Sequence, residues 1–326
     1  MRFRTLLTLT CAITAAMTLT ACGSSGANGV TTKDGVTSVK VGLIPTASFY
    51  PIYVAQDRGF FKDQGLSVEV SVNSNAASVV PSVLNGQLQF GTAATPPFLT
   101  AFEKGLPIKA VVNSAGTAPS EAKDTGGILV LGSSGIKSPS DLVDKKVAVN
   151  ALGSAPHVAA TAILSQAGVD PSTVHFVPMP FPDMLGALQQ KRVDAILPVE
   201  PFMTESLNAD GVHSISALYT KVYPPGTTDT LVFASNEFTA SHPDVVKKFK
   251  AAVEEANAVV AKDPQVLRDA LVKYGHMPKD VAQTIHLSEY GTEFNTTGMQ
   301  QMADQMVKDG FLKKALDVKS TIYQGK

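Results

Sequence analysis

From Ser38 onward the chain alternates short apolar runs with longer amphipathic ones. An apolar run at 39–44 precedes a helix-like stretch that ends at Arg58, with Ser48 as a candidate N-cap and Gly59 as the candidate residue after the helix. Residues 66–72 alternate apolar and polar side chains, which is typical of a half-exposed strand. This strand–helix rhythm predicts an α/β fold built on a mainly parallel sheet covered by helices.

The same rhythm divides the chain into two α/β units and a helical end. The first unit is expected to hold further strands at 88–91 and 108–112 and helices at 76–84 and 97–104. After a polar break at 116–127, the second unit is expected to hold strands at 128–131, 147–150, 174–177 and 195–197, with helices that begin near Ser138, Pro156, Phe181 and Pro201. A strand at 231–234 then precedes four helices expected at 243–262, 264–274, 278–287 and 297–308.

The first 22 residues form a separate segment. Arg2 and Arg4 precede an apolar stretch that ends in the run Leu19 to Cys22, and this order is typical of an export signal. The Cys at its end makes the segment resemble a bacterial lipoprotein signal, in which Cys22 is acylated and becomes the first residue of the mature chain. The alternative is a plain secretory peptide with an incidental Cys. The resemblance implies a protein anchored by lipid at the extracytoplasmic face of the cell membrane.

Composition limits what the mature chain can do. The two cysteines of the sequence are Cys11, in the signal, and Cys22, so no thiol remains for disulfides, Cys chemistry or a Cys metal site. The formal charge of −1 becomes −3 when Arg2 and Arg4 are removed, which provides no electrostatic footprint for nucleic acid. Residues 23–37 are rich in Gly, Ser, Asn and Thr and are predicted to be a flexible tether.

Four stretches of the body carry a resemblance to a known family. Residues 55–66 read AQDRGFFKDQGL, residues 84–91 read LNGQLQFG, residues 138–147 read SPSDLVDKKV, and residues 193–201 run from VDA to EP. In this order and spacing they resemble the substrate-binding proteins of ABC importers in the nitrate, sulfonate, taurine and thiamine-precursor group, the NMT1/THI5-like family. Two positions depart from the family pattern, with Gln89 where Asp is usual and Asp144 where Gly is usual.

The resemblance implies a two-lobed periplasmic-binding-protein fold of type II with a ligand cleft between the lobes. Lobe one is expected to hold 38–126 plus 231–326, and lobe two 127–230. The implied function is a non-enzymatic solute-binding lipoprotein, a monomer without cofactor or metal, which delivers a small molecule to the permease and ATPase subunits of an importer. The alternatives are an enzyme on the same scaffold, of the thiamine-pyrimidine or menaquinone-pathway type, and a ligand sensor for a membrane partner.

In open α/β sheets, ligands bind beyond the carboxyl ends of the strands, where helix N-termini converge. The side chains on such loops are the candidate ligand-binding residues Thr46, Ser48, Phe49, Tyr50, Thr92, Ala94, Thr95, Asn113, Ser154, Ala155, His157 and Glu200. Ser and Thr at these positions have an alternative role as helix caps. Glu200 has two open interpretations, recognition of an amine or ring N–H donor and capping of the helix that begins at Pro201.

Charge and aromatic residues limit the ligand further. The mature chain has three arginines, Arg58, Arg192 and Arg268, and none falls on a predicted cleft loop. An Arg clamp on a sulfonate or carboxylate is therefore not expected. Phe49 or Tyr50 is predicted to form an aromatic wall, so we expect a ligand with a flat or apolar body and few charges, such as a sulfonate, an aromatic acid or a pyrimidine. The six histidines include no close pair at metal-ligand spacing, and His157 is expected to make a simple polar contact.

Overall fold

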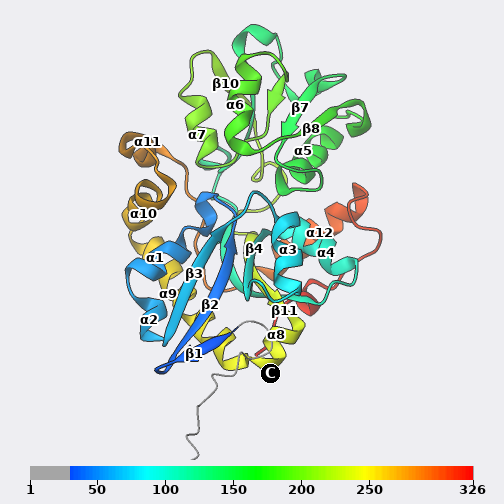
Figure 1. The fold of residues 1–326 in the computed structure, drawn as a ribbon. Coiled ribbons are helices and arrows are strands. Elements are labelled where there is room, and N and C mark those ends of the chain that lie inside the picture. Colours follow the sequence, from blue (N-terminus) through cyan, green and yellow to red (C-terminus); the bar gives the residue numbers. More distant parts are fainter. Residues whose placement is uncertain (1–29, 326) are drawn as a thin grey trace, which may run out of the picture.

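The computed structural model describes residues 30–325, which form two β-sheets flanked by helices, one above the other in Figure 1. The six strands of the first sheet are β1 (Thr31–Lys33), β2 (Val36–Leu43), β3 (Leu66–Val72), β4 (Phe90–Ala94), β5 (Ile108–Gly116) and β11 (Thr228–Ser235). β2 pairs in parallel with β3 and with β4. β11 lies between β4 and β5 and is antiparallel to both. β1 forms a hairpin with the beginning of β2.

The second sheet has five strands in the order β10-β6-β9-β7-β8. Its strands are β6 (Gly127–Leu131), β7 (Lys146–Val149), β8 (His175–Pro178), β9 (Ala195–Ile196) and β10 (Val212–Ala217). β7 pairs in parallel with β8 and β9, whereas β6 is antiparallel to β9 and β10. The helices of this unit are α5 (Ala155–Gln166), α6 (Phe181–Gln189) and α7 (Phe202–Leu207).

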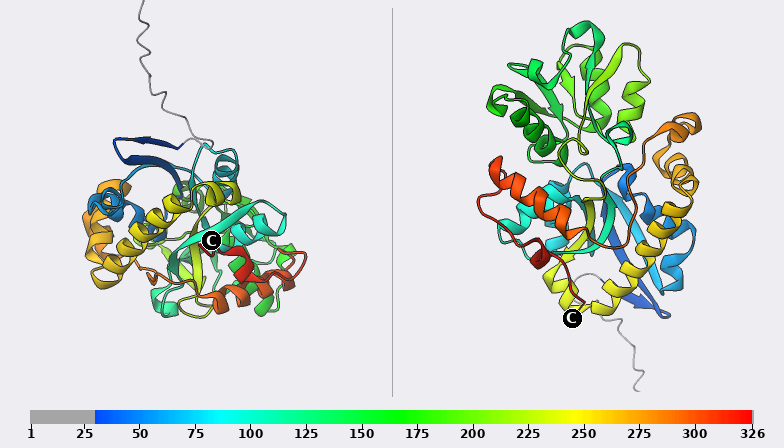
Figure 2. Two further views of the ribbon diagram at one scale, coloured as in Figure 1. Left: turned by 90° about the horizontal axis from the view of Figure 1, so that it is seen from below. Right: turned by 180° about the vertical axis from the view of Figure 1, so that it is seen from behind.

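The remaining helices belong to the first unit. They are α1 (Pro51–Asp57), α2 (Phe60–Asp63), α3 (Ala76–Leu84), α4 (Thr95–Glu103), α8 (Asn236–Ser241), α9 (Pro243–Lys262), α10 (Gln265–Gly275), α11 (Lys279–Thr284) and α12 (Thr296–Lys308). The long helix α9 runs obliquely behind the first sheet and packs against β5, α1 and α2 (Figure 2). α10 and α11 reach up beside the second unit, where α11 contacts α7 (Figure 2). Short 3-10 turns cover Ala47–Phe49, Glu121–Lys123, Gly132–Ser134, Pro139–Leu142, Pro171–Thr173 and Val318–Thr321.

The chain passes between the two sheets twice. It leaves the first sheet after β5, and it returns through 218–227 to enter β11. β11 occupies the position between β4 and β5. The last strand of the first sheet therefore follows the whole second unit in the chain. We therefore keep the division into two lobes as a proposal, with the sheet boundaries at Gly116, Gly127 and Thr228 close to the expected ones.

The structure corrects several sequence expectations. The sheets are mixed rather than mainly parallel, because β11 and β6 run against their neighbours. Residues 31–37, predicted to be part of the tether, instead form the β1–β2 hairpin with a turn at Asp34 and Gly35. The expected helix near Ser138 is only the 3-10 turn Pro139–Leu142, closed by a capping box between Ser138 and Asp141. β10, α2 and α8 were not expected from the sequence.

Several local expectations are confirmed. β3, α3 and α9 have the predicted bounds. Gly59 has φ of 80°, a conformation that favours glycine, and it separates α1 from α2.

The expectation that Ser48 is an N-cap is wrong. Ser48 lies inside the 3-10 turn that precedes α1, and neither of these elements has a side-chain cap. None of the helices among residues 30–325 is long and apolar enough to cross a membrane.

Candidate ligand-binding cleft

A cavity lies between the two sheets, at the carboxyl ends of β2, β4 and β7. The volume of the cavity is about 120 Å³. The lining residues from the first unit are Ile44, Thr46, Ala47, Ser48, Phe49, Asn75, Ala76, Ala77, Ala94, Pro97 and Ser288. Those from the second unit and the connections are Thr125, Asn150, Ala151, Leu152, Gly153, Ser154, Ala155, Pro156, Phe181, Val199, Glu200, Tyr219, Asp229 and Thr230.

Helix N-termini converge on this cavity, as the strand-end rule predicts. The first turns of α3, α4, α5 and α6 contribute Ala76, Pro97, Ala155 and Phe181 to the lining. The first N–H groups of a helix have no partner within the helix and carry a partial positive charge. The cavity can therefore bind polar ligand atoms through backbone groups from both units.

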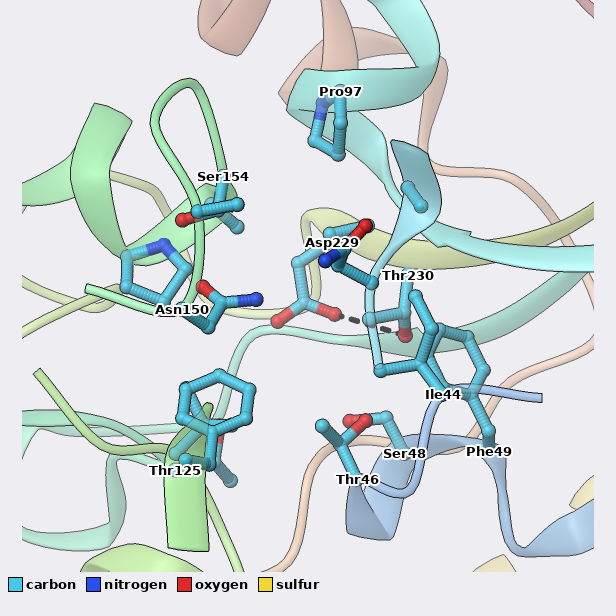
Figure 3. A pocket seen from close by; sticks show the side chains of 18 of the residues that line it. Ile44, Thr46, Ser48, Phe49, Pro97, Thr125, Asn150, Ser154, Asp229 and Thr230 are labelled. Carbon is cyan, nitrogen blue, oxygen red and sulfur yellow. Dashed lines mark hydrogen bonds between the residues drawn. The ribbon is translucent and has the colours of Figure 1, made fainter. Parts of the chain in front are cut away.

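The structure brings seven of the predicted residues to the cavity. They are Thr46, Ser48, Phe49, Ala94, Ser154, Ala155 and Glu200. The Ser48 hydroxyl also lies 3.2 Å from the hydroxyl of Ser288, a residue that the sequence did not indicate. Phe49 and Ile44 lie together on one side of the cavity (Figure 3).

Four other predicted residues do not line the cavity, and three of them use their polar atoms to fix the backbone around it. The Thr92 hydroxyl accepts a hydrogen bond from the Ile44 N–H at 3.0 Å, and the Thr95 hydroxyl donates to the Thr228 carbonyl at 2.9 Å. The side-chain amide of Asn113 donates to the Gly291 carbonyl at 3.1 Å. Tyr50 is 4% exposed, and its ring packs against Tyr53 with a centroid distance of 5.4 Å.

His157 does not line the cavity either. Its Nδ1 accepts a hydrogen bond from the Gly153 N–H at 2.8 Å, and its ring makes edge contacts with Phe176 and Phe311. Desolvation lowers the pKa of His157 to about 4. Gly153 has φ of 74°, so this His–Gly contact fixes the sharp turn of the loop between β7 and α5. The expected polar contact is thus to the loop that forms the cavity.

Glu200 combines the cap that the sequence suggested with a hydrogen bond to the segment after α11. Its carboxylate accepts from the Thr204 N–H at 3.2 Å and from the Thr204 hydroxyl at 2.7 Å, in the first turn of α7. It also accepts from the backbone N–H of His286, in the segment after α11, at 3.0 Å. The Glu200 carbonyl accepts from the Ala47 N–H at 3.1 Å. Desolvation is the main cause that raises the pKa of Glu200 to about 7, although these hydrogen bonds lower it.

Sequence reasoning missed the most unusual group of the cavity, Asp229. It is the second residue of β11 and is 5% exposed. Its carboxylate accepts a hydrogen bond from the Thr230 hydroxyl at 3.2 Å (Figure 3). Burial raises the pKa of Asp229 to about 8, and the nearby Asp124 carboxylate acts in the same direction. Asn150, directly after β7, was also missed as a lining residue, although it is the last residue of the strand predicted at 147–150.

The charged lining is therefore acidic. Among the residues that line the cavity, two carry carboxylates, Glu200 and Asp229, and none is Lys, Arg or His. Arg268, which the sequence placed outside the cleft, donates to the carbonyl groups of Ala282 and Ile285. Within the part of the chain that the structure describes, no group of three or more His, Cys, Asp or Glu residues could hold a metal ion.

Comparison with known proteins identifies the family. The model of the family described as NMT1/THI5 like matches residues 46–266, which is more than half of the chain. The chain belongs to this family. The taurine-binding periplasmic protein of Escherichia coli (strain K12) is 27% identical over 230 residues, covering 70% of this chain and 69% of that protein.

One further relative and one solved structure are also similar to this chain. The 4-amino-5-hydroxymethyl-2-methylpyrimidine phosphate synthase of Schizosaccharomyces pombe is 22% identical over 250 residues, covering 74% of this chain and 69% of that protein. The structure of the alkanesulfonate-binding protein SsuA from Xanthomonas axonopodis pv. citri, bound to MOPS, superposes with a TM-score of 0.74 at 15% identity, covering 88% of this chain and 98% of that one. The fold is therefore the periplasmic-binding-protein fold, as the resemblance implied.

Proposed function

We propose that this protein is the extracytoplasmic solute-binding component of an ABC importer, which captures a small organic molecule and delivers it to permease and ATPase subunits. The observation that carries the proposal is the cavity between the two sheets, lined by residues of both units, in a chain of this family. Such a cavity is completed only when the lobes approach each other, so ligand binding and lobe closure are coupled. The similarity to a taurine-binding protein supports this function.

The candidate ligands are a sulfonate, an aromatic acid and a pyrimidine-like molecule. The apolar lining residues Phe49, Ile44 and Pro97 suit a ligand with a flat or apolar body.

The alternative of an enzyme on the same scaffold has a relative of its own, the fission-yeast pyrimidine phosphate synthase. We favour the binding function because the taurine-binding relative is 27% identical to this chain, compared with 22% for the synthase. The sensor alternative shares the same cleft and differs only in the membrane partner.

A thermal-shift screen tests the proposed function. Sulfonates, nitrate, aromatic carboxylates and pyrimidines are each added to the purified protein. One class is expected to raise the melting temperature, since a ligand at about 100 times its Kd stabilises the folded state by about 2.7 kcal/mol. X-ray scattering with the best ligand is expected to give a smaller radius of gyration than without it. A library in which no compound alters the melting temperature would count against a solute-binding function.

We also propose that Cys22 carries the lipid anchor, a position that lies outside the described residues. Replacing Cys22 by Ser is expected to move the protein out of the membrane fraction or to leave the signal uncleaved, because the acylated thiol is the only attachment. Cell fractionation and mass spectrometry of the mature N-terminus measure this outcome. A wild-type mature protein with an unmodified Cys22 would contradict the proposal.

A further inference from the structure

Three polar side chains of the cavity have hydrogen-bonding capacity that the protein itself does not use. The Oγ of Ser154 and the Oδ1 of Asn150 are buried and have no hydrogen-bond partner. Among residues 30–325, the one side chain that donates to the Asp229 carboxylate is the Thr230 hydroxyl, at 3.2 Å. Buried polar atoms are nearly always paired, and each unpaired one reduces stability. A pocket that retains several such atoms is adapted to a ligand that pairs with them.

These three groups lie together. In Figure 3 the Asp229 carboxylate occupies the middle of the cavity, with Asn150 and Ser154 on one side and Thr230 on the other. Asn150 and Ser154 come from the loop between β7 and α5 in the second unit, whereas Asp229 comes from β11 in the first sheet. A ligand group between them contacts both units at once.

The available atoms are mainly hydrogen-bond acceptors. A carboxylate and an amide Oδ1 accept hydrogen bonds, and a hydroxyl both donates and accepts. The other carboxylate of the lining, Glu200, already accepts three hydrogen bonds, from Thr204 and His286. Asp124, nearby, is held by the N–H groups of Gly126, Tyr219 and Thr220. Asp229 is thus the carboxylate that is left for a ligand.

No positive side chain balances this carboxylate. The lining of the cavity contains no Lys, Arg or His, and a buried carboxylate without a counter-charge is unfavourable. A cationic ligand group supplies the missing charge and stabilises the ionised form of Asp229, whereas an anion does neither.

On the basis of the proposed function, we infer that the ligand carries a protonated nitrogen group, an ammonium or an amidinium-type heterocycle, whose N–H donors bind to Asp229 and to Oδ1 of Asn150. The apolar body of the ligand then lies toward Phe49 and Ile44. The hydroxyls of Thr46 and Ser48 remain for a second polar group, so a zwitterion fits better than a simple anion.

Matched probes test this inference. Each set keeps one body and changes one group: taurine against isethionate, and 2-phenylethylamine against 2-phenylethanol and 2-phenylethanesulfonate. Isothermal titration calorimetry is expected to give at least a tenfold higher affinity for the amine of a set, because a charge-assisted hydrogen bond replaces a neutral one. The inference is overturned if the alcohol or the sulfonate binds as tightly as the amine.

Variants identify the responsible residue. Asp229→Asn keeps the shape of the side chain and removes its charge, and it is expected to abolish the preference for the amine. Asp183→Asn, a neutralised exposed carboxylate two residues from the lining residue Phe181, is the matched control and is expected to keep the preference. An unchanged preference in Asp229→Asn overturns the assignment. If only anionic probes bind, the proposed function stands and the inference is wrong; if no probe of any class binds, the proposed function has failed as well.

Discussion

Replacing Asp229 by Asn is expected to raise the melting temperature of the ligand-free protein at about pH 8.5 and to change it little at about pH 3.5. The reason is the burial of the Asp229 carboxyl, which is 5% exposed and has a pKa raised from 3.8 to about 8. At low pH this carboxyl is neutral in the folded protein, like the amide that replaces it. At high pH the folded wild-type protein must hold an uncompensated charge.

The direction follows from proton binding. Because the folded-state pKa is higher than the unfolded one, the unfolded chain releases its proton first as the pH rises. The wild-type stability from this group is fully present below pH 3.8 and is lost as the pH rises to about 8. One pKa unit corresponds to about 1.4 kcal/mol, so the gain in Asp229→Asn at high pH is about 2 to 5 kcal/mol. The titratable groups that face Asp229 are Asp124, Tyr219 and Tyr290, and all have raised pKa values, so none supplies a counter-charge in this window.

Thermal unfolding followed by circular dichroism at the two pH values measures this effect. For a domain of this kind, 1 kcal/mol moves the midpoint by about 2–4 °C. The control Asp183→Asn, at an exposed position, is expected to differ little from the wild type at either pH. Equal melting temperatures of Asp229→Asn and the wild type at high pH would mean that the Asp229 charge is compensated in the ligand-free protein. A variant that gains stability while it loses the amine preference would identify Asp229 as a residue kept for binding.

The sequence was sufficient to predict the α/β pattern and the edge of the sheets at which the cavity lies. Loops that follow strands contributed Thr46, Ser48, Ala94 and Ser154 to the lining, as expected. Periodicity within one segment determines these elements, so local sequence carries the information. The same is true of β3, α3 and α9, whose apolar spacing determines their bounds.

Asp229 could not be found in this way, because it depends on the path of the chain. The apolar run at 231–234 predicted a strand that begins after Asp229, and nothing local indicates that this strand enters the sheet between β4 and β5. For Thr92, Thr95 and Asn113 the sequence predicted the position but not the role. Their positions on strand ends were correct, but their polar atoms bond to backbone groups that come from distant parts of the sequence. A local sequence pattern does not predict long-range hydrogen bonds of this kind.

Replacing Phe249 by Ala is expected to reduce the free energy of unfolding by about 3 to 5 kcal/mol. Phe249 is fully buried on α9, and its ring stacks on Phe90 of β4 with a centroid distance of 3.9 Å and on Phe61 of α2 with a centroid distance of 5.2 Å. The truncation therefore leaves a cavity where a helix meets the first sheet. The control Val72→Ala, at a side chain that is 61% exposed, is expected to change stability by less than about 0.5 kcal/mol.

Urea unfolding of the ligand-free variants measures this loss. A decrease below about 1 kcal/mol for Phe249→Ala would mean that the aromatic stack is not a main support of the first sheet. Phe249 does not line the cavity. At a low temperature, where the variant is still folded, it is therefore expected to bind ligand with wild-type affinity. This is the reverse of Asp229→Asn, which is expected to gain stability and lose recognition. The two variants together distinguish Phe249, which stabilises the fold, from Asp229, which lowers the stability of the ligand-free protein and binds the ligand.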